Sequence, residues 1–186
     1  MSNIKDKLLL ALQINLAFPE SSKLQQRGIA DKIEADCADI IKSNFNNVTA
    51  ARSRRSIEDV TVEGCYVDVK TSDQALKFKM PNLISIDRLI KLDKPLYYVF
   101  VSYNSETKQI VSVNVLNVYE LNWDHLQIQN LGVGQLQIKN MQSFMQSCNS
   151  NLTKAQWLSV LKKNAVQFYD NLIKKTQKRK KKWEDL

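Results

Sequence analysis

The chain has 186 residues, of which 44% are hydrophobic and 25% charged, with only four Gly and three Pro. This length and composition favour one globular domain and exclude a disordered or collagen-like chain. No apolar run approaches the roughly 20 residues of a transmembrane helix, and no secretory cleavage site follows the first apolar stretch, so we expect a cytoplasmic protein without a membrane span.

The formal net charge of +8 predicts an anionic partner. Clustered Lys and Arg gain affinity for phosphates by releasing counterions, which makes nucleic acid the candidate. One cluster precedes a predicted hairpin, and another lies between residues 174 and 182. The second cluster can equally be a solvated helix end. The three cysteines, Cys37, Cys65 and Cys148, lack metal-ligand spacing and fit a reducing compartment.

In chain order, apolar residues at helical spacing predict two amphipathic helices, over residues 3 to 17 and 28 to 44. Alternation with period two follows from Ser56 to Thr71, and Glu63-Gly64 interrupts it as a hairpin turn. A short helix is predicted at 83 to 92. β-Branched and aromatic residues then predict two strands, at 96 to 104 and 109 to 121.

Residues 122 to 150 are rich in Gln and Asn and predict only a short strand at 135 to 139. Thr153 is predicted to cap a long helix that runs from Lys154 to about Lys181. No repeat or linker divides the chain. The sequence therefore predicts one α/β domain over residues 1 to 186, with a mixed central β-sheet flanked by helices.

The hairpin carries a chemically informative set of charges. A two-residue turn at Glu63-Gly64 places Asp59 opposite Asp68, and strand alternation places Lys70 on the same face as Asp68. Opposed carboxylates repel unless a divalent cation lies between them, and Mg²⁺ prefers carboxylate oxygens with water and substrate phosphate. The pattern predicts a Mg²⁺ site, with Lys70 orienting or helping to deprotonate a water.

Asp59, followed after eight residues by Asp68-Val69-Lys70, resembles the PD-(D/E)xK nuclease superfamily and within it the restriction endonucleases. The resemblance covers about residues 28 to 120 and implies a restriction endonuclease-like core, with 122 to 186 serving DNA recognition or dimerisation. In that family a glutamate on the preceding helix often completes the site. Glu34 fits, because it lies on the apolar face of its helix, where an unpaired carboxylate is costly. Glu58 replaces the family proline, and strand parity predicts that it faces away.

The resemblance implies a type II site-specific deoxyribonuclease that uses Mg²⁺ and leaves 5′-phosphate and 3′-hydroxyl ends. A short palindromic site in double-stranded DNA would be bound by a homodimer. The expected catalytic residues are Asp59, Asp68, Lys70 and Glu34, of which Asp59 and Asp68 hold the metal. Gln and Asn can pair with adenine edges and Arg and Lys with guanine or phosphate. The expected DNA contacts are Arg52, Arg54, Arg55, Gln135, Gln137, Lys139 and Asn140.

Two alternatives stay open. A structure-specific nuclease such as a Holliday junction resolvase can use the same hairpin on branched DNA. A non-catalytic, basic nucleic-acid-binding module would carry the hairpin as structure alone, because an Asp-Val-Lys triplet is common on solvated strands. The sequence contains no P-loop, dinucleotide-binding glycine motif, zinc-spaced Cys/His set or nucleophile elbow, so those enzyme classes are set aside.

Overall fold

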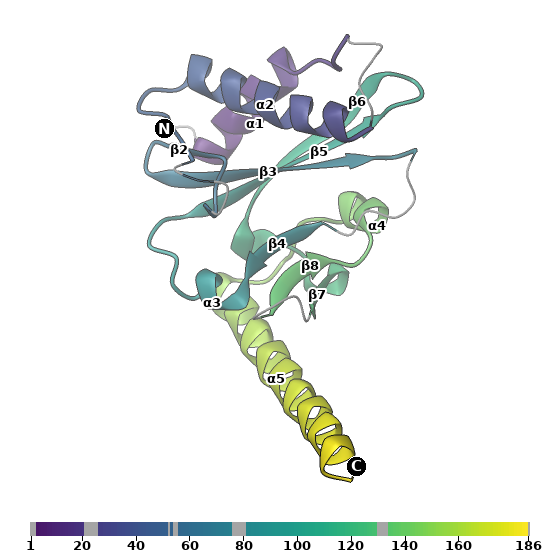
Figure 1. The fold of residues 1–186 in the computed structure, drawn as a ribbon. Coiled ribbons are helices and arrows are strands. Elements are labelled where there is room, and N and C mark those ends of the chain that lie inside the picture. Colours follow the sequence, from purple (N-terminus) through teal and green to yellow (C-terminus); the bar gives the residue numbers. More distant parts are fainter. Residues whose placement is uncertain are drawn as a thin grey trace.

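A five-stranded mixed sheet forms the centre of the molecule (Figure 1). The computed structural model describes residues 3–20, 26–51, 53, 56–75, 81–129 and 134–185. The strand order is β1-β2-β3-β5-β6, and only β3 and β5 pair in parallel. The strands are β1 (Thr49–Ala50), β2 (Val60–Val62), β3 (Cys65–Asp73), β5 (Leu96–Asn104) and β6 (Gln109–Asn117). The predicted α/β class, hairpin and second strand pair are confirmed.

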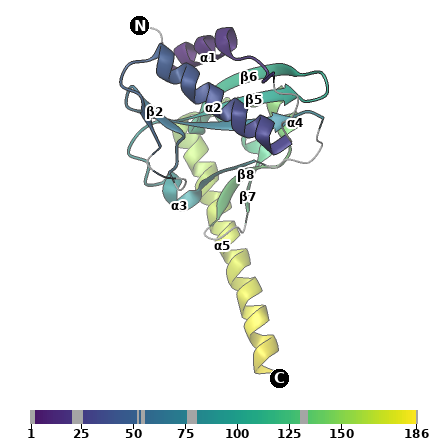
Figure 2. The same ribbon diagram turned by 45° about the horizontal axis from the view of Figure 1, so that its top comes forward.

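Two helices cover one face of this sheet, α1 (Ile4–Asn15) and α2 (Gln26–Asn44), as Figure 2 also shows. Both follow the apolar periodicity of the sequence and begin and end within two residues of the predicted bounds. They meet the side chains at odd positions of β3. The buried residues of this layer include Leu8, Leu12, Ile33, Cys37, Ile41, Val67 and Val69.

The opposite face carries a second sheet, which the sequence did not predict as a unit. Its strands are β4 (Asn82–Ser85), β8 (Gln135–Ile138) and β7 (Leu126–Gln129), in the order β4-β8-β7. The chain between β3 and β5 passes through this layer by way of β4 and the short helix α3 (Ile86–Leu89). Two 3-10 turns, η1 (Val118–Glu120) and η2 (Trp123–His125), and α4 (Met141–Gln146) complete the layer.

The long helix α5 (Lys154–Glu184) begins at the predicted cap. Thr153 accepts a hydrogen bond from the Gln156 N–H, and the Gln156 side chain accepts one from the Thr153 N–H. The first half of α5 is anchored by Trp157, which is fully buried and donates from Nε1 to the Leu121 carbonyl at 2.8 Å. The second half projects away from the body (Figures 1 and 2). None of the described helices has the length and apolar character needed to cross a membrane.

The anchoring of α5 by Trp157 is testable. Replacing Trp157 by Ala removes a fully buried ring and leaves the Leu121 carbonyl without its partner, so the free energy of unfolding should fall by about 3–5 kcal/mol. Trp183→Ala is the matched control, because Trp183 is 78% exposed, and it should change stability by no more than about 0.5 kcal/mol. Urea denaturation measures both. Equal effects of the two substitutions would contradict this packing.

Candidate active site

The β2–β3 hairpin positions the predicted carboxylates. Glu63 and Gly64 both have positive φ, 46° and 80°, as a tight two-residue hairpin turn requires. Val62 pairs with Cys65 and Val60 with Val67, which confirms the predicted register. The prediction that Asp59 pairs directly with Asp68 was wrong. Regular pairing ends at Val60, and the Asp59 N–H donates to the Val67 carbonyl at 2.9 Å.

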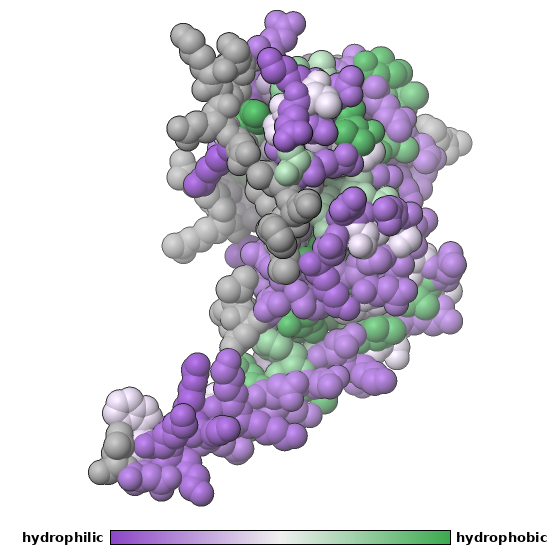
Figure 3. Space-filling model, turned by 90° about the vertical axis from the view of Figure 1, so that its right-hand side faces the viewer, coloured by the Kyte–Doolittle hydropathy of each residue, from purple (hydrophilic) through white to green (hydrophobic). Residues whose placement is uncertain are grey.

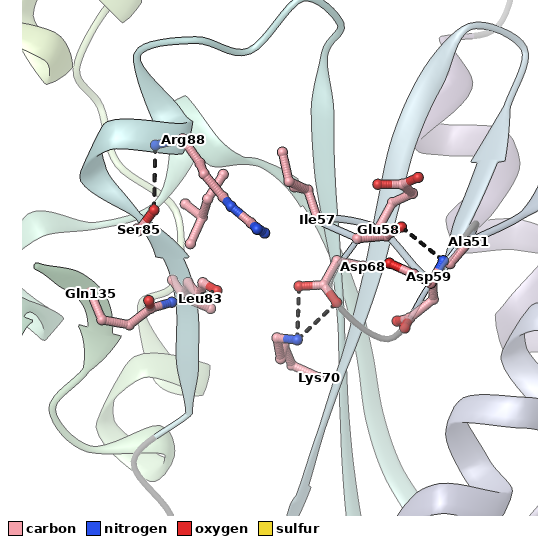
Figure 4. A pocket seen from close by; sticks show the side chains of 13 residues that line it. Ala51, Ile57, Glu58, Asp59, Asp68, Lys70, Leu83, Ser85, Arg88 and Gln135 are labelled. Atoms are coloured by element: carbon pink, nitrogen blue, oxygen red, sulfur yellow. Dashed lines mark hydrogen bonds and ion pairs between the residues drawn. The ribbon is translucent and has the colours of Figure 1, made fainter. Parts of the chain in front are cut away.

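Asp59 also contacts the neighbouring strand β1. Its carbonyl accepts a hydrogen bond from the Ala51 N–H, one position beyond the Ala50–Val60 pair. The Asp59 carboxylate then reaches back to β3, where its Oδ2 accepts the Val69 N–H at 2.7 Å. Asp59 is therefore fixed by backbone contacts on both strands, and its carboxylate remains beside Asp68 (Figure 4).

Asp68 is the buried member of the pair, with a side chain only 8% exposed. Its register neighbour on β5 is Tyr98, which is fully buried. Both carboxylate oxygens lie 2.8 Å from Lys70 Nζ. The pKa of Asp68 is raised to about 7, chiefly by burial; Lys70 opposes this rise and the nearby Asp59 carboxylate contributes to it. Asp68 is thus a carboxylate whose charge depends on a neighbouring cation.

A pocket of about 720 Å³ opens above this pair. The hairpin side contributes Asp59, Asp68 and Lys70, and the facing wall contributes residues of β4, α3 and β8 (Figure 4). The guanidinium of Arg88, on α3, extends across the pocket toward Asp68. The Arg88 N–H is accepted by Ser85 Oγ at 3.4 Å, which caps the short helix. No spacing rule points to Arg88, because it meets the hairpin only through the tertiary fold.

Glu58 also lines this pocket, so the prediction that it faces away was wrong. Strand parity does not apply to it, because β2 begins only at Val60. Ala51 and Ser53 line the pocket as well. The predicted phosphate contacts Arg52, Arg54 and Arg55 lie outside the described residues.

Glu34 lies on the other face of β3 from Asp68 and Lys70. Its Oε1 accepts a hydrogen bond from Thr71 Oγ1 at 3.1 Å, and Thr71 points to the helix side of the sheet. Burial raises the pKa of Glu34; the Thr71 hydrogen bond opposes this rise, Asp59 adds to it, and Lys70 opposes it. The predicted fourth member is therefore coupled to the site by charge but does not line the pocket, and its catalytic role stays a prediction.

Of the four DNA contacts predicted in the Gln-rich segment, only Gln135 lines the pocket, where its Nε2 donates to the Leu83 carbonyl. Gln137 is buried, donates to Asn82 and accepts from Gln127, so its amide serves the second sheet. The other two are occupied in local contacts: Lys139 donates to the Asp124 carbonyl, and Asn140 caps α4 by accepting the Ser143 N–H.

No protein-family model and no curated protein matches this chain. Within the described residues, no group of three or more His, Cys, Asp or Glu side chains is arranged to hold a metal ion. Three carboxylates line the pocket, those of Glu58, Asp59 and Asp68, and of these Asp59 and Asp68 lie beside each other as the donor set. Mg²⁺ in phosphate-handling sites is bound by one or two carboxylates, with water and substrate phosphate completing its shell. Asp59 and Asp68 match the protein part of such a site, in which water and phosphate supply the remaining ligands.

The burial of Asp68 predicts a pH-dependent stability. The folded protein keeps the Asp68 proton up to about pH 7, whereas the ordinary value is 3.8. Between these values the folded state binds more protons than the unfolded chain, so rising pH destabilises the fold. In metal-free protein, Asp68→Asn should therefore be more stable than the wild type, and its advantage should grow by about 2–3 kcal/mol from pH 5 to pH 8.

Urea denaturation in EDTA at the two pH values measures this advantage. Asp39→Asn is the control for the loss of one negative charge, because the Asp39 side chain is 71% exposed. An Asp68→Asn advantage that is constant or shrinks as the pH rises would show that Asp68 is not desolvated in the folded state.

Proposed function

We propose that this protein is a Mg²⁺-dependent endonuclease that hydrolyses phosphodiester bonds in double-stranded DNA at a short specific site. One observation carries the proposal: a buried Asp68 beside Asp59 is neutralised by Lys70 at the floor of an open pocket whose far wall presents Arg88. A charge set of this kind is costly for the fold. Its placement in a pocket rather than on a solvated strand favours chemistry over structure.

The metal would be held by Asp59 and Asp68. The Val69 N–H fixes the Asp59 carboxylate, and the strand fixes Asp68, so both donors are preorganised. When bound, Mg²⁺ polarises the phosphoryl group and lowers the pKa of a water ligand. The two carboxylates leave the rest of the coordination shell to water and to a phosphate oxygen. The affinity for Mg²⁺ would therefore rise when a nucleic acid substrate is bound.

The cationic residues act on the substrate itself. Lys70 is half-buried beside Asp68, where its ammonium can hold the attacking water and stabilise the negative charge that develops on the phosphate. Arg88 faces it across the pocket and can donate two parallel hydrogen bonds to phosphate oxygens. The scissile phosphate would then lie between Lys70 and Arg88. A palindromic site read on both strands would need two copies of the chain, related as a homodimer.

The proposal predicts cleavage of plasmid DNA that requires Mg²⁺ and stops in EDTA. Lys70→Ala and Asp68→Asn should lower the cleavage rate at least about 100-fold, while the metal-free variants remain folded. Arg88→Ala should weaken turnover about tenfold or more by removing a charge-assisted phosphate contact. Lys42→Ala and Arg27→Ala are matched controls, because both residues are exposed on α2 and neither lines the pocket. Gel analysis and end mapping measure the products.

The pattern of products separates the alternatives. Discrete fragments with 5′-phosphate ends support a restriction-type enzyme, and cleavage confined to four-way junctions would identify a structure-specific nuclease instead. DNA binding without cleavage, unchanged by Lys70→Ala, would overturn the enzymatic proposal and leave a binding module.

A further inference from the structure

The projecting half of α5 has an extreme charge. Seven of the nine residues from 174 to 182 are Lys or Arg, and none of the nine is apolar. All of them are exposed. Within the described chain this segment forms one ion pair, between Lys180 and Glu184. We call residues 174–182 the basic arm; Figure 3 shows the projecting part of α5 as a hydrophilic surface that stands clear of the body.

The part of α5 that precedes the basic arm contacts the wall of the pocket. Tyr169 Oη donates to Asp87 Oδ1 at 3.3 Å, and Asp87 directly precedes Arg88. One residue earlier, Phe168 packs against Gly134, where an added Cβ would lie 3.1 Å from the ring. Gly134 directly precedes the pocket residue Gln135. The helix therefore leaves the body at α3 and β8, the same elements that face Asp68 across the pocket.

We infer that the basic arm binds the phosphodiester backbone of duplex DNA alongside the pocket, an inference that rests on the proposed endonuclease function. The segment from Ile173 to Glu184 extends roughly 18 Å at the rise of an α-helix. Duplex DNA carries one negative charge for about every 1.7 Å of its axis, so an arm of this length can neutralise several phosphates. At 3.6 residues per turn, six of the seven cations lie on one side of the helix, and Lys180 lies on the other. A cationic stripe of this kind suits a contact that fixes position without reading sequence.

The composition of the arm argues against other occupants. A second copy of the helix would bring the same charge and no apolar seam to pack, since Ile173 and Trp183 are separated by the nine polar residues. An interfacial membrane helix needs a continuous apolar face, which the same nine residues interrupt. Like charges at i, i+4, such as Lys174 with Lys178, destabilise the free helix. Phosphates relieve that repulsion.

Fluorescence anisotropy with a 30-base-pair duplex in EDTA tests the inference, because no cleavage occurs under these conditions. The arm variant exchanges four lysines for glutamine: Lys174→Gln, Lys178→Gln, Lys181→Gln and Lys182→Gln. The control variant makes the same charge change at four exposed lysines outside the arm: Lys7→Gln, Lys42→Gln, Lys162→Gln and Lys163→Gln. Circular dichroism verifies that both variants keep their helices.

We expect the arm variant to bind DNA at least tenfold more weakly than the control variant. The slope of log affinity against log salt should fall by about two or more in the arm variant, since each lost phosphate contact removes roughly 0.9. Amide exchange of residues 174–182 should slow when wild-type protein binds the duplex. Equal losses in the two variants would show that net charge alone matters and would overturn the inference.

Preferential binding of vesicles of phosphatidylserine and phosphatidylcholine, lost in the arm variant while DNA affinity is unchanged, would also overturn it. The inference and the proposed function fail separately. Wild-type protein that binds DNA through the arm but never cleaves it refutes the nuclease alone. A protein that cleaves DNA with arm-independent affinity refutes the arm alone.

Discussion

The arrangement of the site depends on the buried ion pair between Asp68 and Lys70. An unpaired, ionised carboxylate at this depth would cost several kcal/mol, and Lys70 lowers that cost for the ionised form, which prevails only above about pH 7. Lys70 lies two positions along β3, on the same face. The other face of β3 is apolar at Val67 and Val69 and packs against α1 and α2. A single strand thus separates the core from the charged pocket.

The same pair explains why the pocket exists. Tyr98 and Phe100, the register neighbours of Asp68 and Lys70 on β5, are buried in the layer that contains the second sheet. At β3 the facing wall instead presents Ser85, Arg88 and Gln135 and leaves an open volume above the charges. Full closure would bury Lys70 as well as Asp68, at a further desolvation cost. The open side leaves both groups accessible from solvent.

Local patterns in the sequence predicted much of this site. The Glu63-Gly64 turn and the alternation around it gave the register of Val60 with Val67 and the shared face of Asp68 and Lys70. The positions of Asp59 and Glu58 were misjudged, because strand parity was extended past the first residue of β2. Nothing local indicates that the regular pairing with β3 would end at Val60. Glu34 was correctly placed on the buried side of its helix, but its partner, Thr71, lies on the face away from the pocket.

The features that could not be predicted from the sequence depend on tertiary contacts. In the second sheet β7 and β8 pair as sequence neighbours, but β4 pairs with β8 across more than 50 positions, as Asn82 does with Gln137, so no local signal predicts the sheet as a unit. Arg88 and the buried state of Gln137 follow from that sheet. In contrast, Thr153 and Gln156 form a complete capping box in sequence, and the predicted start of α5 was confirmed. The sequence alone does not place the basic arm near the pocket. Its position follows from the contact of Tyr169 with α3.

The central claim is that Asp59 and Asp68 together form a divalent cation site. Calorimetric titration of the wild-type protein with Mn²⁺ in the presence of an uncleavable phosphorothioate duplex tests it most directly. The account predicts saturable binding that is lost in both Asp59→Asn and Asp68→Asn and retained in Asp39→Asn. Binding that persists unchanged in the two pocket variants, or its absence in the wild type, would contradict the account.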